Sequence, residues 1–229
     1  MTLVAVPGVL AHESRIYQIE HDTFQFTVGS LNEPIAVDDK TGVELIVARV
    51  AAPAMGVMAK NENMASHDHE NNGAVIGLEK TLKVEISAGD KKKTMELTPI
   101  YGKEGSYRAN FIPTVQTTYT YRFFGTVHDT PVDVSFSCNP AGHPVSPEDT
   151  NQVKLGDEVT QLKRSGAFGC PVAKADLGFP EPSVSENDLA GEMATVRSEA
   201  KSAAATGMTG VGAGVLGLII GAAAWIKRR

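Results

Sequence analysis

Apolar and polar residues alternate with a period of two in seven short stretches of the chain between residues 23 and 138. Such alternation is typical of β-strands that have one buried face and one hydrated face. The predicted strands are Thr23–Ser30, Gly42–Val50, Thr81–Ala88, Lys93–Ile100, Ser106–Pro113, Thr118–Val127 and Pro131–Cys138. Their number and the turn residues between them predict an all-β, immunoglobulin-like sandwich over residues 12–138.

The alternation stops after Cys138, where the composition changes. Residues 139–186 are rich in Pro, Asp and Ser, which predicts a linker. Residues 187–205 predict a helical stalk, whose first turn Asn187 or Asp188 is suited to cap. The narrow apolar stripe of this stalk consists of Leu189, Met193, Val196 and Ala200. A second copy of the stalk is a candidate partner for that stripe.

Residues 206–226 carry no charge and are followed by the basic tail 227–229. A helix of this length spans about 30 Å, the thickness of the hydrocarbon core of a bilayer. Basic residues directly after a membrane helix mark the cytoplasmic side. The sequence thus predicts a single-pass protein of the cell membrane with an extracytoplasmic N-terminal domain and a cytoplasmic C-terminus. The alternative is a buried helix of a soluble protein.

Four glycines of the predicted transmembrane helix fall on one helical face. They are Gly210, Gly214, Gly217 and Gly221. Small residues at this spacing let two membrane helices approach closely. The face is therefore a candidate helix-packing surface for a homodimer or for a polytopic membrane partner.

Residues 1–11 have the character of a signal-peptide remnant. The segment is apolar, and Val9 and Ala11 place small residues before His12, as at a signal-peptidase site. The basic region that begins an ordinary signal peptide is missing, so an apolar first strand that stays attached is the alternative. Cleavage after Ala11 would make His12 the first residue.

Composition narrows the function classes. The net charge is −6 and no basic stripe is present, which argues against nucleic-acid binding. The chain has no nucleophile, phosphate-binding or HExxH motif, so we expect that it is not an enzyme. Its two cysteines, Cys138 and Cys170, favour one disulfide in an oxidising compartment. Two free thiols or a metal-binding pair are the alternatives.

Methionine and histidine gather in an insertion between two predicted strands, over residues 51–76. The candidate copper ligands there are Met55, Met58, Met64, His67 and His69. Thioethers select Cu(I) and imidazoles suit Cu(II), so a loop with both could hold copper in either state. The alternative interpretation is a polar excursion with no special function.

His12 is a further candidate ligand if the chain is cut after Ala11. The free amine and the ring nitrogen of one residue could then chelate a single Cu(II) ion, because an α-amino group loses its proton at a pKa of about 8. A second imidazole would complete the set of nitrogen ligands. His21, His128 and His143 are the candidates for it.

Several stretches of the chain resemble a known family of secreted, membrane-anchored proteins. They are GSLNEP (29–34), GLEKTLKVEISAG (77–89), YRANFIPT (107–114) and YTYRFFGTVHDTPVDVSF (119–136). The family is largely uncharacterised and is described as YtkA-like or CopC-like. The resemblance implies an immunoglobulin-type β-sandwich and copper handling. CopC-like Cu(II) sites combine an N-terminal His with an Asp-Gly-His stretch, but here Ala141 stands in the place of that Asp, before Gly142 and His143.

Two functions from different classes therefore remain. The first is a membrane-anchored extracytoplasmic copper-binding or copper-delivery protein. The second is a non-metal structural or interaction module of a membrane complex, a β-sandwich displayed on a stalk.

Overall fold

The computed structural model describes residues 11–51, 73–140 and 149–204. The chain divides into two compact units, with the boundary between Leu177 and Gly178. Strands make up the first unit, and one α-helix is the main element of the second.

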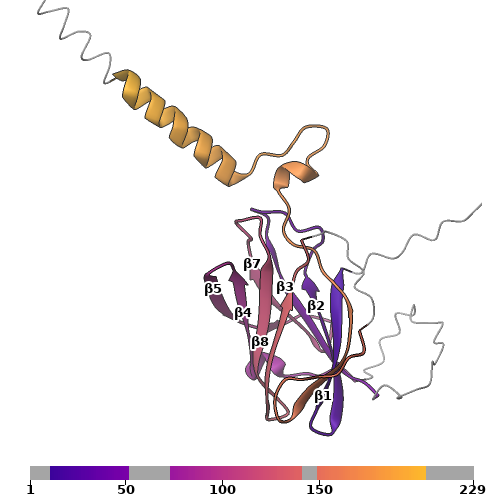
Figure 1. Cartoon of the computed structure of the whole chain (residues 1–229). Coiled ribbons are helices and arrows are strands. Elements are labelled where there is room, and N and C mark those ends of the chain that lie inside the picture. The colour runs from indigo at the N-terminus through magenta and orange to yellow at the C-terminus, as the bar shows by residue number, and fades with distance from the viewer. Residues whose placement is uncertain (1–10, 52–72, 141–148, 205–229) are drawn as a thin grey trace, which may run out of the picture. The chain divides into compact units, whose positions relative to one another are not determined.

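Two antiparallel sheets form the first unit (Figure 1). In the described residues the larger sheet has the order β10-β11-β1-β2-β3-β7-β6, and the smaller has the order β5-β4-β8-β9. The strands of the larger sheet are β1 (His12–Ile19), β2 (Asp22–Ser30), β3 (Thr41–Arg49), β6 (Thr98–Pro99), β7 (Ser106–Phe111), β10 (Val153–Lys154) and β11 (Val159–Gly166). Those of the smaller sheet are β4 (Leu82–Ala88), β5 (Lys91–Glu96), β8 (Tyr119–Val127) and β9 (Thr130–Ser137). Two short 3-10 helices, η1 (Leu78–Lys80) and η2 (Lys174–Leu177), complete the unit.

The core lies between the two sheets, where the apolar face of each strand is buried. The largest fully buried apolar and aromatic side chains are Tyr17, Phe24, Phe26, Ile35, Leu45, Leu82, Tyr107, Tyr121, Phe123, Phe136 and Phe168. Contacts across the two layers include a 3.2 Å hydrogen bond between the hydroxyls of Ser30 and Tyr121. The rings of Tyr121 and Phe168 stack with their centroids 5.2 Å apart. The structure therefore confirms a β-sandwich.

Each of the seven strands predicted from the alternation corresponds to observed strand structure, within a few residues at the ends. One prediction, Lys93–Ile100, covers parts of two strands, because β5 ends at Glu96 and β6 begins at Thr98. The period of two was reliable here because all these strands bury one face against the opposite sheet.

The linker predicted over residues 139–186 needs correction, because β10 and β11 lie within it. Strand β11 pairs with β1, a strand that the sequence analysis also missed. Both strands carry charged side chains, which interrupt the apolar alternation. The sandwich therefore extends well beyond Cys138.

A buried ion cluster explains those charges. Glu13 of β1 is fully buried, and the Nε of Arg15 donates to its Oε1 at 2.8 Å. The Nε of Arg164 on β11 forms an ion pair with the same oxygen at 2.6 Å. The guanidinium carbon of Arg15 also lies 4.2 Å from the centre of the Phe136 ring on β9. An ion pair thus links β1 to β11, and a cation–π contact links β1 to the opposite sheet.

A disulfide joins Cys138 and Cys170, as predicted, with their Cα atoms 4.9 Å apart. Cys138 follows β9 of the smaller sheet, and Cys170 follows β11 of the larger sheet. The bond therefore ties the two layers together covalently.

The second unit contains a helix over residues 186–204, and the predicted stalk covers residues 187–205. Its cap differs from the prediction: the backbone N–H of Asp188 donates to the Ser185 hydroxyl at 3.1 Å, so Ser185 takes the capping role that was expected of Asn187 or Asp188. None of the helices in the described part of the chain is long and apolar enough to cross a bilayer. The predicted signal-peptide remnant before Ala11, the predicted transmembrane helix, its four glycines and the basic tail lie outside the described residues.

Candidate functional site

His12, Gly29 and Glu44 form one row across three neighbouring strands. The register pairs His12 of β1 with Gly29 of β2, and Gly29 with Glu44 of β3. The neighbours of Glu44 along β3, Val43 and Leu45, are fully buried in the core. Because side chains alternate along a strand, the row lies on the outer face of the larger sheet.

Gly29 provides the space in which the His12 ring lies. A Cβ atom at position 29 would stand 2.5 Å from Cδ2 of His12 and 2.9 Å from its Cγ. With only hydrogen there, the imidazole crosses over the middle strand. Its Nε2 then lies 3.1 Å from Oε2 of Glu44. A side chain on β1 thus reaches a side chain on β3, two strands away.

The charge state of Glu44 fixes the protonation pattern of the ring. The hydrogen bond from His12 lowers the pKa of Glu44, burial opposes this, and Lys103, 4.0 Å away, lowers it further. An ionised carboxylate can only accept a hydrogen bond, so the proton of the neutral imidazole lies on Nε2. The other nitrogen, Nδ1, then keeps its lone pair. Metal-ligating histidines commonly donate their other ring N–H to a carboxylate in this way.

A second carboxyl group, that of Glu33, lies within electrostatic range of His12. Burial raises the pKa of Glu33 to about 7, while the hydrogen bond from the backbone N–H of Gly169 and the electrostatic interaction with His12 act in the opposite direction. A Cβ atom on Gly169 would lie 2.9 Å from Oε2 of Glu33, so the carboxyl group lies directly against that glycine. Its Oε1 is buried and has no hydrogen-bond partner among the described residues. The surroundings of His12 therefore contain one carboxyl group whose pKa is lowered and one whose pKa is raised to about 7.

Two of the three candidates for a second imidazole lie too far from His12. His21 is in the turn between β1 and β2, about 25 Å along the strands from His12 at about 3.3 Å per residue. His128 follows β8, and its ring lies 5.3 Å from that of Phe24, near the start of β2. The hypothesis that His21 or His128 completes a site with His12 is therefore wrong.

The remaining predicted ligands lie outside the described residues. They are His143 and the members of the insertion, Met55, Met58, Met64, His67 and His69. Within residues 11–51, 73–140 and 149–204, no group of three or more His, Cys, Asp or Glu side chains is arranged to hold a metal ion.

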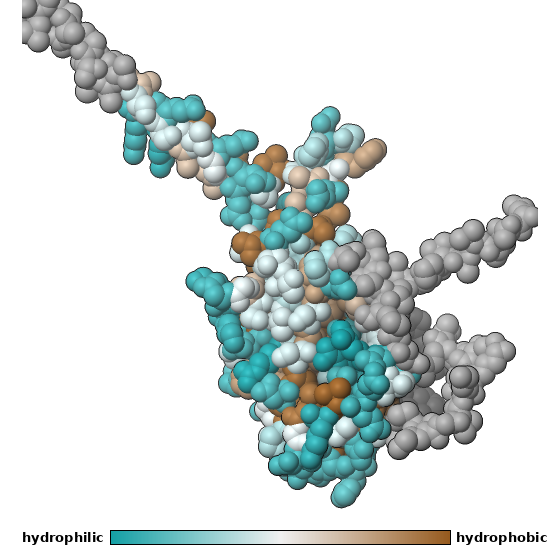
Figure 2. Space-filling view, viewed as in Figure 1, coloured by the Kyte–Doolittle hydropathy of each residue, from teal (hydrophilic) through white to brown (hydrophobic). Residues whose placement is uncertain are grey.

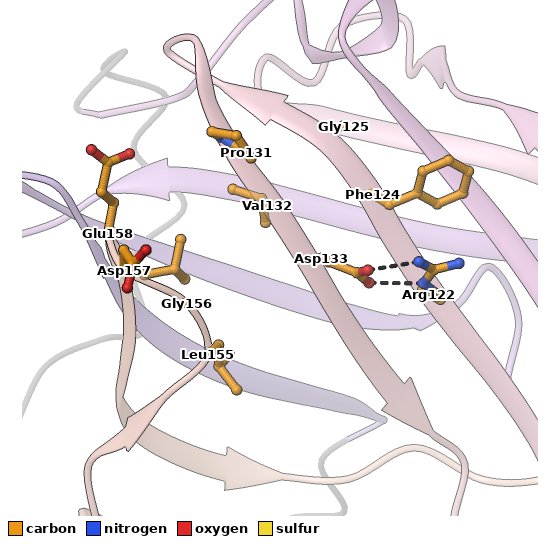
Figure 3. A pocket seen from close by; sticks show the side chains of 11 residues that line it. Arg122, Phe124, Gly125, Pro131, Val132, Asp133, Leu155, Gly156, Asp157 and Glu158 are labelled. Atoms are coloured by element: carbon orange, nitrogen blue, oxygen red, sulfur yellow. Dashed lines mark hydrogen bonds and ion pairs between the residues drawn. The ribbon is translucent and has the colours of Figure 1, made fainter.

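A groove on the smaller sheet offers less chemistry than the His12 row. It runs between β8, β9 and the loop that joins β10 to β11 (Figure 3). Among the described residues that line it, the one cation is Arg122, which donates to both oxygens of Asp133 at 2.8 and 2.6 Å. The same guanidinium lies 3.6 Å from Glu85. Because its charge is already neutralised by two carboxylates, the described residues of this groove offer no available cation to an anionic ligand.

Sequence reasoning identified His12 but missed Gly29, Glu33 and Glu44. Glu44 did leave a signal, since it is the one charged residue within the apolar run GVELIVA. Glu44 is buried although it lies on the outer face of the sheet, and a buried acidic side chain needs a partner. The identity of that partner followed only from the sheet register.

Comparison with known proteins gives no significant similarity: no protein-family model, no curated protein and no solved structure matches the chain.

Proposed function

We propose that the chain is a membrane-anchored extracytoplasmic copper-binding or copper-delivery protein, in which His12 is the principal Cu(II) ligand after cleavage of the Ala11–His12 bond. The observation that carries the proposal is the His12–Glu44 hydrogen bond of 3.1 Å. It engages Nε2 and leaves the lone pair of Nδ1 for a metal. Nδ1 is also the ring nitrogen that can join with the residue's own amine in one small chelate ring.

The donor set fits Cu(II) better than a hard cation. An amine and an imidazole are nitrogen donors of the kind that Cu(II) prefers. Glu44 supplies the orienting carboxylate behind the ring, and such partners typically contribute 10–100-fold in metal affinity. His143 and the Met/His insertion are the proposed sources of further ligands. Delivery to a partner would require only that these ligands exchange.

Membrane attachment, the extracytoplasmic location and the immunoglobulin-like classification belong to this proposal. Support for export comes from the disulfide between Cys138 and Cys170, since such bonds persist in oxidising compartments. The uncharged segment 206–226 and its basic tail support the anchor. The resemblance to YtkA-like and CopC-like proteins supports the immunoglobulin-like classification and copper as the metal.

The first test is mass spectrometry of the protein recovered from cells. The proposal expects a mature chain that begins at His12. The second test is a Cu(II) titration of this chain, followed by electron paramagnetic resonance, which detects nitrogen ligands directly. We expect one bound Cu(II) with nitrogen coordination, and its loss in His12→Ala.

Matched controls separate this site from surface histidines. His21→Ala removes an imidazole at the opposite end of the strands and should leave the titration unchanged. His67→Ala with His69→Ala tests the insertion independently. Cu(II) binding that is the same in His12→Ala as in the wild type, or a mature chain that still carries residues before His12, would contradict the proposal.

The second candidate function is a structural or interaction module without a metal. The observation that favours it is the absence, within the described segments, of a three-residue metal-binding group. It predicts a mature protein that binds neither Cu(II) nor Cu(I) and that is recovered with a membrane complex. The same titration, repeated with Cu(I) under anaerobic conditions, distinguishes the two functions.

A further inference from the structure

The helix over residues 186–204 leaves all its large apolar side chains in solvent. Leu189 is 51% exposed, and Met193 and Val196 are each 64% exposed. In the space-filling view, apolar residues lie among the charged residues of this helix (Figure 2). A helix of this length is only marginally stable in water without a surface to pack against. Its apolar stripe therefore calls for a partner.

The spacing of the stripe is that of a coiled coil. From Leu189 the apolar positions follow at intervals of four and three residues, which places Leu189, Val196 and Ala203 at heptad position d and Met193 and Ala200 at position a. The pattern thus presents one narrow seam, suited to a partner helix with the same spacing.

The charges beside the seam select a second copy of the same helix. In this register Glu192 occupies position g and Arg197 occupies position e of the next heptad. In a parallel pair of helices these are the positions that meet across the interface. Neither side chain has an ion-pair partner among the described residues. Two identical helices would therefore form the Glu192–Arg197 pair twice, once on each side.

The same charges disfavour an antiparallel pair. In that arrangement position g meets g and position e meets e, so Glu192 and Glu199 would face other glutamates and Arg197 would face an arginine. Like charges at these positions are repulsive. The pattern therefore specifies the orientation as well as the partner.

We propose that the stalk helix 186–204 forms a parallel, two-stranded coiled coil with the stalk of a second copy of this chain. Continued along the sequence, the same a and d count reaches Gly207, Gly210, Gly214, Gly217 and Gly221. These residues lie outside the described part of the chain, but four of them are the predicted helix-packing glycines. The seam of the stalk and the glycine face thus share one register in the sequence.

Cysteine cross-linking of the full chain tests the interface. Both native cysteines are joined to each other, so a single introduced cysteine reports without background. Val196→Cys places a thiol at position d, on the seam, and Ser198→Cys places a matched thiol at position f, on the opposite side. A short bismaleimide should link Val196→Cys into a dimer at least about tenfold more efficiently than Ser198→Cys.

A charge exchange then tests the orientation. In the Val196→Cys background, Glu192→Arg places like charges at both g–e contacts and should weaken dimerisation by about fivefold, the effect expected of exposed ion pairs. Adding Arg197→Glu restores opposite charges and should recover the cross-linked dimer. Sedimentation of the same proteins gives the dissociation constants directly.

Three results would overturn the proposal. One is equal cross-linking of Val196→Cys and Ser198→Cys, because a specific seam would distinguish them. Another is a Glu192→Arg, Arg197→Glu double variant that dimerises no better than Glu192→Arg alone. The third is a cross-linked product of Val196→Cys that contains a different membrane protein, which would assign the stripe to another partner.

Discussion

Substituting Gly29 by Ala should displace the His12 ring and destabilise the fold. The new Cβ would stand 2.5 Å from Cδ2 of His12, whereas ordinary contacts begin at 3.4 Å. The difference, 3.4 − 2.5, requires the ring to retreat by about 0.9 Å. The 3.1 Å hydrogen bond to Glu44 would then lengthen beyond the range of a hydrogen bond. Glu44 would then lose its hydrogen bond from His12.

The magnitude follows from three contributions. Forcing an extra carbon into a packed contact costs about 1–3 kcal/mol. Losing a hydrogen bond to a charged group costs roughly 1 kcal/mol here, because both side chains are partly exposed to water. Alanine in a strand recovers about 0.5–1 kcal/mol relative to glycine. We therefore expect Gly29→Ala to lower the free energy of unfolding by about 2 kcal/mol.

Urea denaturation of the full chain measures this loss, and Gly156→Ala is the matched control. A Cβ on Gly156 meets nothing within 4 Å, so this variant should stay within about 0.5 kcal/mol of the wild type. Nitrogen NMR of the imidazole supplies a second readout, since displacement of the ring should remove the preference for a proton on Nε2. If Gly29→Ala unfolds at the wild-type urea concentration and keeps that preference, the derived geometry of the row is wrong.

Three further predictions concern stability. Burial raises the pKa of Glu33 from 4.5 to about 7, so its ionisation costs the folded state nothing below pH 4.5 and most above pH 7. In pH-dependent urea denaturation, the free energy of unfolding of Glu33→Gln should therefore match that of the wild type at pH 4.5. At pH 8 it should exceed the wild-type value by about 1–2 kcal/mol, after allowance for the partial exposure of Glu33. Replacing Cys138 and Cys170 by Ser opens a loop with a sequence separation of 32 and should cost about 3–4 kcal/mol, and a melting temperature equal to that of the wild type would contradict this. Glu13→Ala leaves two arginines without their shared carboxylate and should cost about 3 kcal/mol; calorimetry that shows no loss would mean that the cluster contributes nothing to the fold.

Strands that bury one apolar face could be predicted from the sequence, and strands that bury charge could not. In β4 the residues Leu82, Val84 and Ile86 are buried, and their spacing of two residues predicts this burial. In β1 two of the inward-facing residues are Glu13 and Arg15, which the alternation treats as hydrated. Their burial becomes comprehensible only once β11 brings Arg164 beside them, from a distant part of the chain.

The candidate site divides in the same way. His12 could be identified from the sequence because the small residues before it predict a cleavage site that would give it a free amine. Its partner Glu44 is 32 positions away, and no spacing rule relates the two. Their contact depends on the register of three strands and on the missing side chain of Gly29. Such a relation belongs to the sheet and is not visible in any single segment.

The position of β1 between β2 and β11 sets the order in which the molecule can mature. Strand β1 pairs with a strand that ends at Gly166, and the carboxyl group of Glu33 lies against Gly169. A nascent chain that has emerged only as far as β9 therefore still lacks β11, which pairs with β1. Strand β1 is therefore held on both sides only after β11 has been made, late in the synthesis of the described part of the chain.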